Sequence, residues 1–493
     1  MNTRTYLAFD LGAESGRLIA GNYDGKTLQI QELHRFVNNG IWLGEHLHWD
    51  VLHIWNEIKI GLSAAANEYG ESVFSIGMDT WGVDFGLLAA DDTLIGIPYH
   101  YRDQRTKGIM ETVFTRIPKS EIYKQTGNQF LELNSLFQLY SMAAMNAPAL
   151  SIAHTFLNMP DLLNFYLTGC KVNEYTISST TQCFNMQGQE WAFDLLTRLG
   201  IPTKIFSEVV PPGTVLGELR PSLKEDISLD SASVIASAGH DTASAVAAIP
   251  VSSSDYIYLS SGTWSLLGVE LDHPDTSQDS LNAGMTNEGG VGNKIRYLKN
   301  IIGLWLVQEC RRVWASQGKL YTYDELTHMS SDAQPFVSLI VPDDSRFVTP
   351  RDMPAAIQSF CSDTGQSIPL DKGAIIRCIL ESLALEYRWV TAQIERLRKL
   401  DYPIIHIIGG GAKNKLLNQF IADATNKTII AGPIEATALG NILVQMTAMG
   451  DIESILEGRA IVGDSFELQT YVPAKSIAWD DAYERYLTLK VRE

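Results

Sequence analysis

The chain has 493 residues, of which 45% are hydrophobic and 19% charged, so it is globular in composition and long enough for two large domains. Its formal net charge of −19, without any run of Lys or Arg, argues against a nucleic-acid or anionic-membrane partner. The five cysteines form no C-x-x-C pair, and no signal peptide or apolar run of ~18 residues is present, so we predict a cytoplasmic protein without a disulfide framework or zinc site.

The first predicted element is a hairpin, two apolar strands over residues 6–20 joined by a glycine-containing turn. Gly12 and Gly16 permit a tight bend, while Ser15 and Arg17 add a hydroxyl and a positive charge. Such a turn offers N–H groups and a cation to a phosphate, and Asp10 could face a hydrated Mg²⁺. An ordinary hairpin whose polar residues satisfy their own turn explains the same pattern.

The rest of the first half alternates between helix and strand signals, which predicts a mixed α/β layer. A third strand is expected over 27–36, and Asp50 precedes a helix with one apolar face that ends at Gly70. Residues 97–142 are interpreted as loops and short helices lining a polar cleft. We also predict strands over 73–78 and 233–237 and a helix from 159 that stops at Gly169.

The second half begins with another hairpin, from residue 255, which repeats the plan of the first around a Ser-Ser-Gly-Thr turn. This similarity suggests two related halves, with a boundary near residue 248. A helix is expected from about Ile301, and a longer helix has its buried face between residues 376 and 397. A strand over 404–408, the following helix and strand, and a last helix over 436–450 complete a second α/β unit.

Three glycine-containing turns at strand ends need a common explanation: 12–16, Gly262 and 409–411. The P-loop and dinucleotide-binding fingerprints are absent. Two hairpin turns from different halves could grip a polyphosphate, and a triple-glycine strand end lets an adenine or ribose approach the backbone closely.

Several longer motifs resemble the FGGY family of carbohydrate kinases, which belongs to the actin/hexokinase/Hsp70 fold group. The resemblance covers nearly the whole chain and is closest to the rhamnulokinase branch. Generic members carry a lysine in the segment that corresponds to 134–139, whereas this chain, like that branch, has none. The matching motifs are DTWGVDF (79–85), YRDQRT (101–106), HDTASAV (240–246), YLSSGTWSL (258–266), TNEGG (286–290), LKNIIGLWLVQ (298–308) and IGGGAKNKLLNQ (408–419).

The resemblance implies an α/β fold of two actin-like (ribonuclease H-like) domains around a central cleft. Residues 1–248 would bind the sugar and residues 249–493 the nucleotide. The implied activity is ATP-dependent phosphorylation of a deoxyketose, with L-rhamnulose preferred and L-fuculose the runner-up. A nucleotide-gated chaperone of the same fold group is the alternative from another class. The partners would be a ketose and ATP, without nucleic acid or membrane; a monomer and a homodimer both stay open.

Asp241 matches the family's general base, which would take the proton of the attacking sugar hydroxyl. From the residues alone, the N-cap of a small-residue helix is the favoured explanation of Asp241, and the family match reverses this preference. His240, Thr242, Gly82 and Asn300 match sugar-contacting positions. Their ordinary alternatives include a core histidine at 240 and an exposed helix-start residue at 300.

Three neighbouring residues, one aromatic and two charged, are further candidates for sugar binding. Trp81 either stacks on the sugar or belongs to the core. Asp84 and Arg102 either bind sugar hydroxyls or form surface salt bridges.

On the nucleotide side, the resemblance implies that Thr263 and the first turn hold the phosphates, while Gln308 and Gly411 border the adenosine. Asp10 would orient Mg²⁺ through water, since oxygen ligands and a triphosphate suit that metal. The implied residues of the first turn are Ala13, Glu14, Ser15, Gly16 and Arg17.

Overall fold

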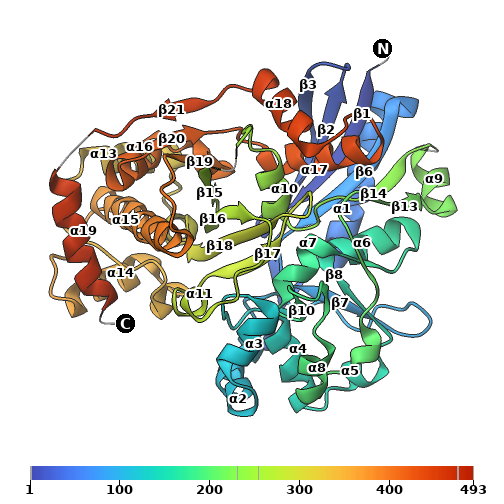
Figure 1. Cartoon of the computed structure of the whole chain (residues 1–493), viewed down its shortest axis with the longest axis horizontal. Coiled ribbons are helices and arrows are strands. Elements are labelled where there is room, and N and C mark those ends of the chain that lie inside the picture. Colours follow the sequence, from blue (N-terminus) through green and yellow to red (C-terminus); the bar gives the residue numbers. More distant parts are fainter. Residues whose placement is uncertain (1–2, 230, 254, 475–476, 492–493) are drawn as a thin grey trace. The chain divides into compact units, whose positions relative to one another are not determined.

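The computed structural model describes residues 3–229, 231–253, 255–474 and 477–491. The chain forms two compact units, each built from three segments (Figure 1). Unit 1 contains residues 1–252, 270–297 and 436–466, and unit 2 contains residues 253–269, 298–435 and 467–493. Among the described helices, none combines the length and apolar character that a bilayer span requires.

Unit 1 is built on a six-stranded sheet with the order β13-β14-β6-β1-β2-β3. Strands β14, β6 and β1 are parallel to one another, whereas β2, β3 and β13 run antiparallel to their neighbours. The predicted opening hairpin and third strand are confirmed. The strands are β1 (Arg4–Leu11), β2 (Ser15–Tyr23), β3 (Leu28–Val37), β6 (Val73–Thr80), β13 (Thr214–Glu218) and β14 (Ser233–Ala236).

Helices α1 (Val51–Tyr69) and α6 (Met159–Thr168) pack on one face of this sheet. The Asp50 carboxylate caps α1 by accepting from the His53 N–H, and Gly70 ends the helix as predicted. Gly169 ends α6 in the left-handed conformation, also as predicted. The apolar side chains of alternate β1 residues meet both helices, because successive residues of a strand point to opposite faces.

The opposite face of the sheet contacts helix α17 (Ala436–Ala448). Gln445 accepts a hydrogen bond from Ser75 Oγ at 2.7 Å and donates to the Leu7 carbonyl at 3.0 Å. The chain order predicts this helix in the second α/β unit, whereas its polar and apolar partners group it with unit 1. Helix α10 (Asp241–Ala247) packs beside it.

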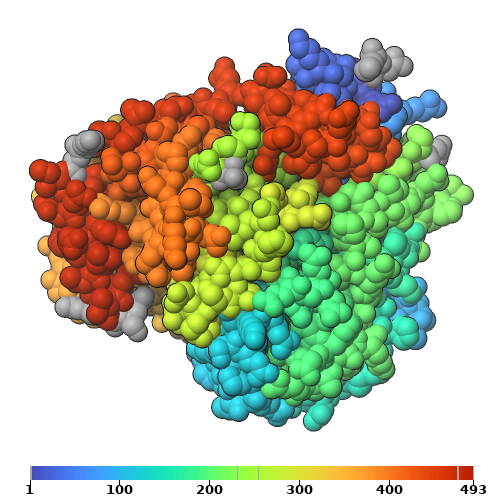
Figure 2. All heavy atoms as spheres, in the orientation of Figure 1, coloured from blue at the N-terminus to red at the C-terminus, as the bar shows by residue number. Residues whose placement is uncertain are grey.

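The remaining segments of unit 1 are short, as expected for residues 97–142, and α2 and α3 lie on the surface that Figure 2 shows. The helices are α2 (Ile109–Arg116), α3 (Lys119–Thr126), α4 (Ser135–Ala144), α5 (Pro148–Ile152), α7 (Tyr175–Ser178), α8 (Phe193–Arg198), α9 (Pro221–Ile227), α11 (Gln278–Asn282) and α18 (Ile455–Ser465). The strands are β4 (Gly40–Leu43), β5 (His46–Trp49), β7 (Phe85–Leu88), β8 (Thr155–Asn158), β9 (Asn173–Glu174), β10 (Phe184–Asn185), β11 (Glu190–Trp191), β12 (Val209–Val210) and β17 (Thr286–Gly289).

Unit 2 is organised around the second hairpin, β15 (Tyr256–Ser261) and β16 (Trp264–Leu271), which is confirmed. Strands β19 (Ile404–Ile408) and β20 (Thr428–Ala431) extend it in parallel to β15, so this sheet repeats the plan of the first. Beyond the hairpin the sheet also contains β17, β21 (Gln469–Tyr471) and β18 (Ile295–Ile302), of which residues 295–297 are grouped with unit 1. The helices are α12 (Trp305–Ser316), α13 (Tyr323–Asp332), α14 (Met353–Asp363), α15 (Lys372–Arg398), α16 (Lys415–Thr425) and α19 (Ile477–Lys490).

The expected helix start near Ile301 is wrong. Ile301 lies in strand β18, which ends at Ile302, and helix α12 begins only at Trp305. Gly303 makes the transition, because its N–H bonds to the Thr263 carbonyl and a side chain there would collide with Ser265.

Candidate functional site

Three parallel strands of unit 1 end at the same edge of the sheet, and several predicted site residues lie there. Asp10 on β1 is in register with Asp79 on β6. One residue further, the Thr80 N–H bonds to the Gly239 carbonyl at 2.9 Å and Thr80 forms a bridge with His240. Because ligands of open α/β sheets bind beyond the carboxyl ends of the strands, this edge is the candidate site of unit 1.

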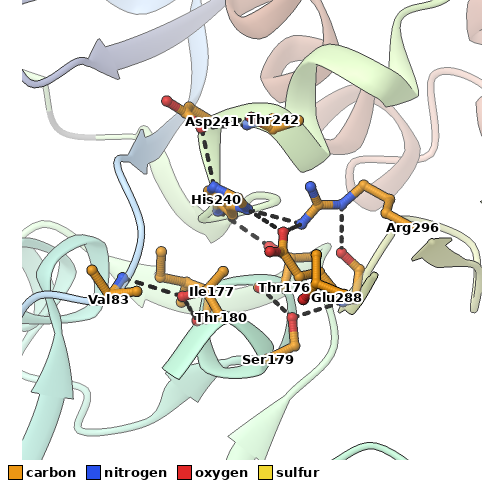
Figure 3. Close-up of polar contacts among 12 residues, drawn as sticks. Val83, Thr176, Ile177, Ser179, Thr180, His240, Asp241, Thr242, Glu288 and Arg296 are labelled. Atoms are coloured by element: carbon orange, nitrogen blue, oxygen red, sulfur yellow. Dashed lines mark hydrogen bonds and ion pairs between the residues drawn. The ribbon is translucent and has the colours of Figure 1, made fainter. Parts of the chain in front are cut away.

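Asp241 is the first residue of α10, and the N-cap position is occupied by His240 instead. The N-cap interpretation of Asp241 is therefore wrong. Its Oδ1 accepts from the N–H and hydroxyl of Thr242 and lies 3.3 Å from His240 Nε2 (Figure 3). Oδ2 has no hydrogen bond to the part of the chain that the structure describes, and the side chain is 34% exposed. One carboxylate oxygen is thus held while the other is accessible.

The imidazole of His240 is buried among charged groups rather than apolar ones. Its Nδ1 lies 2.8 Å from Arg296 Nη2 and 3.3 Å from Glu288 Oε2, and these two side chains pair with each other at 3.0 Å. The backbone N–H of His240 bonds to Thr176 Oγ1 at 3.2 Å. The core-histidine alternative correctly describes its burial, but the ring also links Asp241 to a buried ion pair (Figure 3).

Glu174 holds the backbone that precedes His240. Its carboxylate accepts from the Gly239 N–H at 3.0 Å and from the N–H groups of Thr176 and Ile177. Burial raises the pKa of Glu174 to about 7, although these hydrogen bonds favour the ionised form. No sequence signal pointed to Glu174.

Two further buried residues were missed, Glu288 and Arg296. The TNEGG motif that contains Glu288 was noticed only as a family match, and nothing in the local sequence marks Arg296 as a partner of residue 240.

Asp84 is a buried carboxylate that receives hydrogen bonds from four neutral donors. They are Trp49 Nε1 at 2.6 Å and Trp81 Nε1, the Tyr101 N–H and Gln138 Nε2, each at 3.0 Å. Burial raises the pKa of Asp84 to about 6. The surface-salt-bridge alternative is therefore wrong for Asp84. Trp81 is a buried residue stacked near Trp49, as the core alternative stated.

Gly82 lies in the loop between Trp81 and Asp84 and faces Thr180. A Cβ atom at residue 82 would come within 3.1 Å of Thr180 Oγ1. The next residue, Val83, has a φ of 68°, a strained conformation for a β-branched residue. Its N–H bonds to Thr180 Oγ1 at 3.2 Å, and its carbonyl accepts from Ser135 Oγ. Strain of this kind persists only where surrounding contacts enforce it and is concentrated at binding sites.

The segment without the family's lysine instead contributes Gln138. This side chain donates to Asp84 and accepts from Arg105 Nη2 at 2.5 Å, so it links a buried acid to a buried base. Arg105 is the deeply buried arginine of the YRDQRT motif, whereas Arg102 is half-buried with its guanidinium near the Tyr101 ring.

The predicted phosphate turn, residues 12–16, is tightly tied. The Gly12 N–H bonds to the Ser15 carbonyl at 3.0 Å, and Asn38 Nδ2 donates to the Gly12 carbonyl at 2.7 Å. Gly16 is required for another reason than the one expected, since a side chain there would overlap the Phe36 ring. Arg17 pairs with Asp10.

In unit 2 the structure brings Thr263, Gln308 and Gly411 to one end of β15. The carbonyls of Gly262 and Thr263 accept from the N–H groups of Leu304 and Trp305 at the start of α12, whose first turns contain Gln308. A side chain at Gly411 would overlap Ser261 Oγ, so this glycine allows close approach. Ser261 Oγ and Gln308 Oε1 are buried atoms without a protein hydrogen bond among the described residues.

Asn300 lies on β18, half-buried, so the helix-start alternative for this residue is wrong.

The carboxylates at the sheet edge fit a weakly held, water-coordinated cation rather than a metal cage. Burial, followed by the charge of Asp10, raises the pKa of Asp79 well above its ordinary value, and Asn441 Nδ2 donates to Asp79 at 2.7 Å. Among the described residues, no group of three His, Cys, Asp or Glu side chains is arranged to hold a metal ion. A Mg²⁺ ion here would take most of its oxygen ligands from phosphates and water.

Comparisons with known proteins decide the family. Residues 5–248 match the N-terminal domain of the FGGY family of carbohydrate kinases, and residues 257–449 match its C-terminal domain. The chain belongs to the FGGY family of carbohydrate kinases. Members of this family use ATP.

This kinase is similar over nearly its whole length to rhamnulokinases. It is 44% identical over 480 residues to that of Bacteroides thetaiotaomicron, covering 97% of this chain and 98% of the relative. It is 38% identical over 495 residues to that of Pectobacterium atrosepticum, covering 100% and 98%.

Solved structures show the same two-domain, actin-like fold. Gluconate kinase from Lactobacillus acidophilus matches with a TM-score of 0.82 at 16% identity, covering 100% of this chain and 98% of that one. Glycerol kinase from Plasmodium falciparum with ADP matches with a TM-score of 0.78 at 15% identity, covering 99% and 98%. The predicted fold class is confirmed.

Proposed function

We propose that this kinase transfers the γ-phosphoryl group of ATP to L-rhamnulose and forms L-rhamnulose 1-phosphate and ADP. The similarity to rhamnulokinases over the whole length supports this substrate. The observation that carries the catalytic assignment is the partly exposed Asp241, whose Oδ2 is free of hydrogen bonds to the described residues while Oδ1 is held.

In the proposed reaction Asp241 acts as the general base. As the sugar hydroxyl oxygen attacks the γ-phosphorus, its proton passes to Asp241 Oδ2. The bond between the γ-phosphorus and the bridging oxygen breaks, and ADP leaves with that oxygen. Phosphoryl transfer needs mainly positioning and charge neutralisation, so a single oriented carboxylate suffices for the proton.

We assign sugar binding to residues 1–248 and nucleotide binding mainly to residues 249–493. His240, Thr242 and Gly82 lie at the same sheet edge as Asp241 and would contact the ketose, with Asn300 as a further contact. The strained Val83 next to Gly82 supports a binding role for this loop.

On the nucleotide side, Ala13 to Arg17 and Thr263 would hold the phosphates. Gln308 and Gly411 would border the adenosine; the unpartnered buried oxygens of Ser261 and Gln308 support a polar ligand there. Asp10 would orient Mg²⁺ through water, and the ion would neutralise charge on the triphosphate.

The test is a coupled ADP-release assay with L-rhamnulose, L-fuculose, L-xylulose, L-ribulose and glycerol. We expect the highest kcat/KM for L-rhamnulose. A higher value for L-fuculose would replace the substrate but keep the kinase assignment, since these sugars differ in hydroxyl stereochemistry and hydrogen-bonding sites discriminate strongly. ADP release that is independent of every sugar would instead favour the chaperone-like alternative.

A further inference from the structure

The four side chains Asp241, His240, Arg296 and Glu288 form one connected line in unit 1 (Figure 3). His240 is the link, because its Nε2 faces Asp241 and its Nδ1 faces Arg296 and Glu288. Arg296 and Glu288 come from β18 and β17, and Arg296 has no solvent exposure. Desolvating the two charges of the Arg296–Glu288 pair is costly. Because the pair contacts His240, which in turn contacts the proposed base Asp241, we looked for a functional reason for it.

The contact with Arg296 decides where the proton of the imidazole resides. A guanidinium carries only donors, so the Nδ1 atom 2.8 Å from Arg296 Nη2 must present its lone pair. The ring proton of a neutral histidine then lies on Nε2, which faces Asp241 Oδ1 at 3.3 Å. The opposite tautomer would direct an N–H at the guanidinium, which is the nearer of the two groups that face Nδ1, and a lone pair at the Asp241 carboxylate.

Glu288 keeps this arrangement electrically balanced. Burial is the largest single influence and would raise the pKa of Glu288, but Arg296 and His240 together outweigh it and hold the pKa below its ordinary value. Glu288 is therefore an anion beside Arg296, at 3.0 Å. Arg296 is also oriented by a hydrogen bond from its Nε to the Gly289 carbonyl at 2.9 Å.

We propose that Arg296, balanced by Glu288, is a positioning residue that fixes the proton of His240 on Nε2, so that His240 holds Asp241 Oδ1 and leaves Oδ2 for the sugar hydroxyl. This inference deepens the proposed function and rests on Asp241 as the base. A neutral, donating histidine orients the carboxylate without the full ion pair that an imidazolium would form with it. An ion pair would stabilise the carboxylate and weaken it as a proton acceptor.

The charged groups around His240 predict the effect of losing Arg296. The ring is faced by Asp241 from α10, Glu288 from β17 and Arg296 from β18, with Glu174 from β9 behind the adjoining Gly239 N–H. In Arg296→Gln the remaining charged neighbours are carboxylates, so the guanidinium no longer holds Nδ1 as an acceptor. The proton of His240 should therefore no longer be fixed on Nε2 in this variant.

The first test reads the tautomer directly in the intact enzyme. In protein labelled with ¹⁵N-histidine, the signals of His240 are assigned by their loss in His240→Gln. We expect the neutral Nε2–H pattern in the wild type and a shift towards imidazolium or Nδ1–H in Arg296→Gln. A wild-type Nδ1–H tautomer would overturn the proposal. This readout needs no sugar, so it separates failure of the inference from failure of the substrate assignment.

The second test uses kinetics with matched variants. We expect Arg296→Gln to lower kcat roughly 10- to 100-fold with a smaller change in the KM for ATP, and Glu288→Gln to lower kcat less, because Arg296 still donates to Nδ1. Arg459→Gln is the control: it removes another partly buried Arg–Glu pair, with Glu270, whose arginine bonds to carbonyls at the far end of α10. If Arg459→Gln lost as much kcat as Arg296→Gln, the loss would be explained by reduced stability alone, and the proposal would be contradicted.

A pair of substitutions at His240 keeps the proposal testable if Arg296→Gln does not fold. Glutamine places a neutral N–H near the position of Nε2, whereas asparagine places it near Nδ1. We expect His240→Gln to retain at least roughly tenfold more kcat than His240→Asn. Equal activities would show that a donor facing Asp241 does not matter.

Discussion

The two oxygens of Asp241 differ in their surroundings, and this difference matters for catalysis. Oδ1 is occupied by Thr242 and His240, whereas Oδ2 has no hydrogen bond to the described residues. A carboxylate held on one side has its accepting oxygen oriented in advance, which lowers the cost of reaching the reactive geometry.

Asp241→Asn should therefore remove most phosphorylation and leave nucleotide binding intact. The amide keeps the shape of the side chain but cannot accept the hydroxyl proton, so we expect kcat to fall by roughly 10²- to 10⁴-fold. Isothermal titration with ATP should give a dissociation constant within about threefold of the wild type. Turnover at the wild-type rate would refute the assignment of the base.

Asp84 predicts a pH dependence of stability. Burial raises its pKa to about 6 from 3.8, so the folded protein binds this proton more tightly than the unfolded chain. The stability from this group is fully present below pH 3.8 and is lost as pH rises through about 6. At ~1.4 kcal/mol for each pKa unit, the change amounts to about 3 kcal/mol.

Urea unfolding of the wild type and Asp84→Asn between pH 4 and 8 checks this prediction. The asparagine does not titrate, so the difference in unfolding free energy between the two proteins should change across that range and become constant above pH 7. The exposed Asp332→Asn serves as the control and should show no such change. A difference that is independent of pH would mean that Asp84 titrates normally.

At the scale of single residues, the sequence predicted helix caps and stops better than it predicted the tertiary surroundings of a side chain. Asp50 and Gly169 were predictable because a cap or a left-handed stop is a local property. A surface salt bridge was one of the two expectations for Asp84, because nothing in its neighbouring sequence reveals that two indoles, from Trp49 and Trp81, donate to it. Arg296 could not be predicted for the same reason, since its partner lies 56 residues away.

At the scale of elements, the contact between α10 and α17 links the candidate base to the rest of unit 1. A side chain at Gly440 on α17 would overlap the carbonyl oxygen of Ser244 on α10. The two helices are therefore in backbone contact, and α10 carries Asp241 at its first position. Any increase in their separation moves the start of α10 relative to the sheet edge.

Gly440→Ala should consequently lower both stability and activity. We expect a loss of about 1–3 kcal/mol in unfolding free energy, the range of overpacked cores, together with a lower kcat. Gly463→Ala on α18 is the matched control, since a side chain there makes only an ordinary contact with Pro250. The control should be neutral or more stable by up to ~1 kcal/mol, because alanine is the better helix former. Unfolding in urea and ADP release measure both effects, and unchanged kcat in a destabilised Gly440→Ala would separate this contact from catalysis.

Most elements could be predicted because their signals are periodic and local. The two hairpins, α1 and the long helix α15 follow from apolar spacing. The start of α12 was misplaced because the apolar residues before Gly303 fit a strand and a helix equally well. Tertiary contacts of Gly303 with the 262–263 turn decide between them, and these are invisible in the sequence.

At the scale of the whole molecule, the chain order does not match the compact units. Unit 1 combines residues 1–252 with the distant segments 270–297 and 436–466. Gln445 and Asn441 on α17 bond to Ser75, Leu7 and Asp79, all buried in the first segment. Without α17 these polar groups would lose their partners, and leaving buried donors and acceptors unpaired costs about 1–3 kcal/mol each.

This arrangement predicts that α17 unfolds with unit 1 and not with the strands that precede it in the chain. Native-state hydrogen exchange at increasing denaturant resolves such cooperative openings. We expect the amides of α17 to open together with those of β1 and β6, because its buried hydrogen bonds are made to those strands. Helix α16, which precedes it in the sequence, is the internal control and should open with β20 and α15, against which it packs within unit 2. If α17 instead exchanges together with α16, the unfolding units follow the chain order, and the hydrogen bonds of Gln445 and Asn441 contribute little to the cohesion of unit 1.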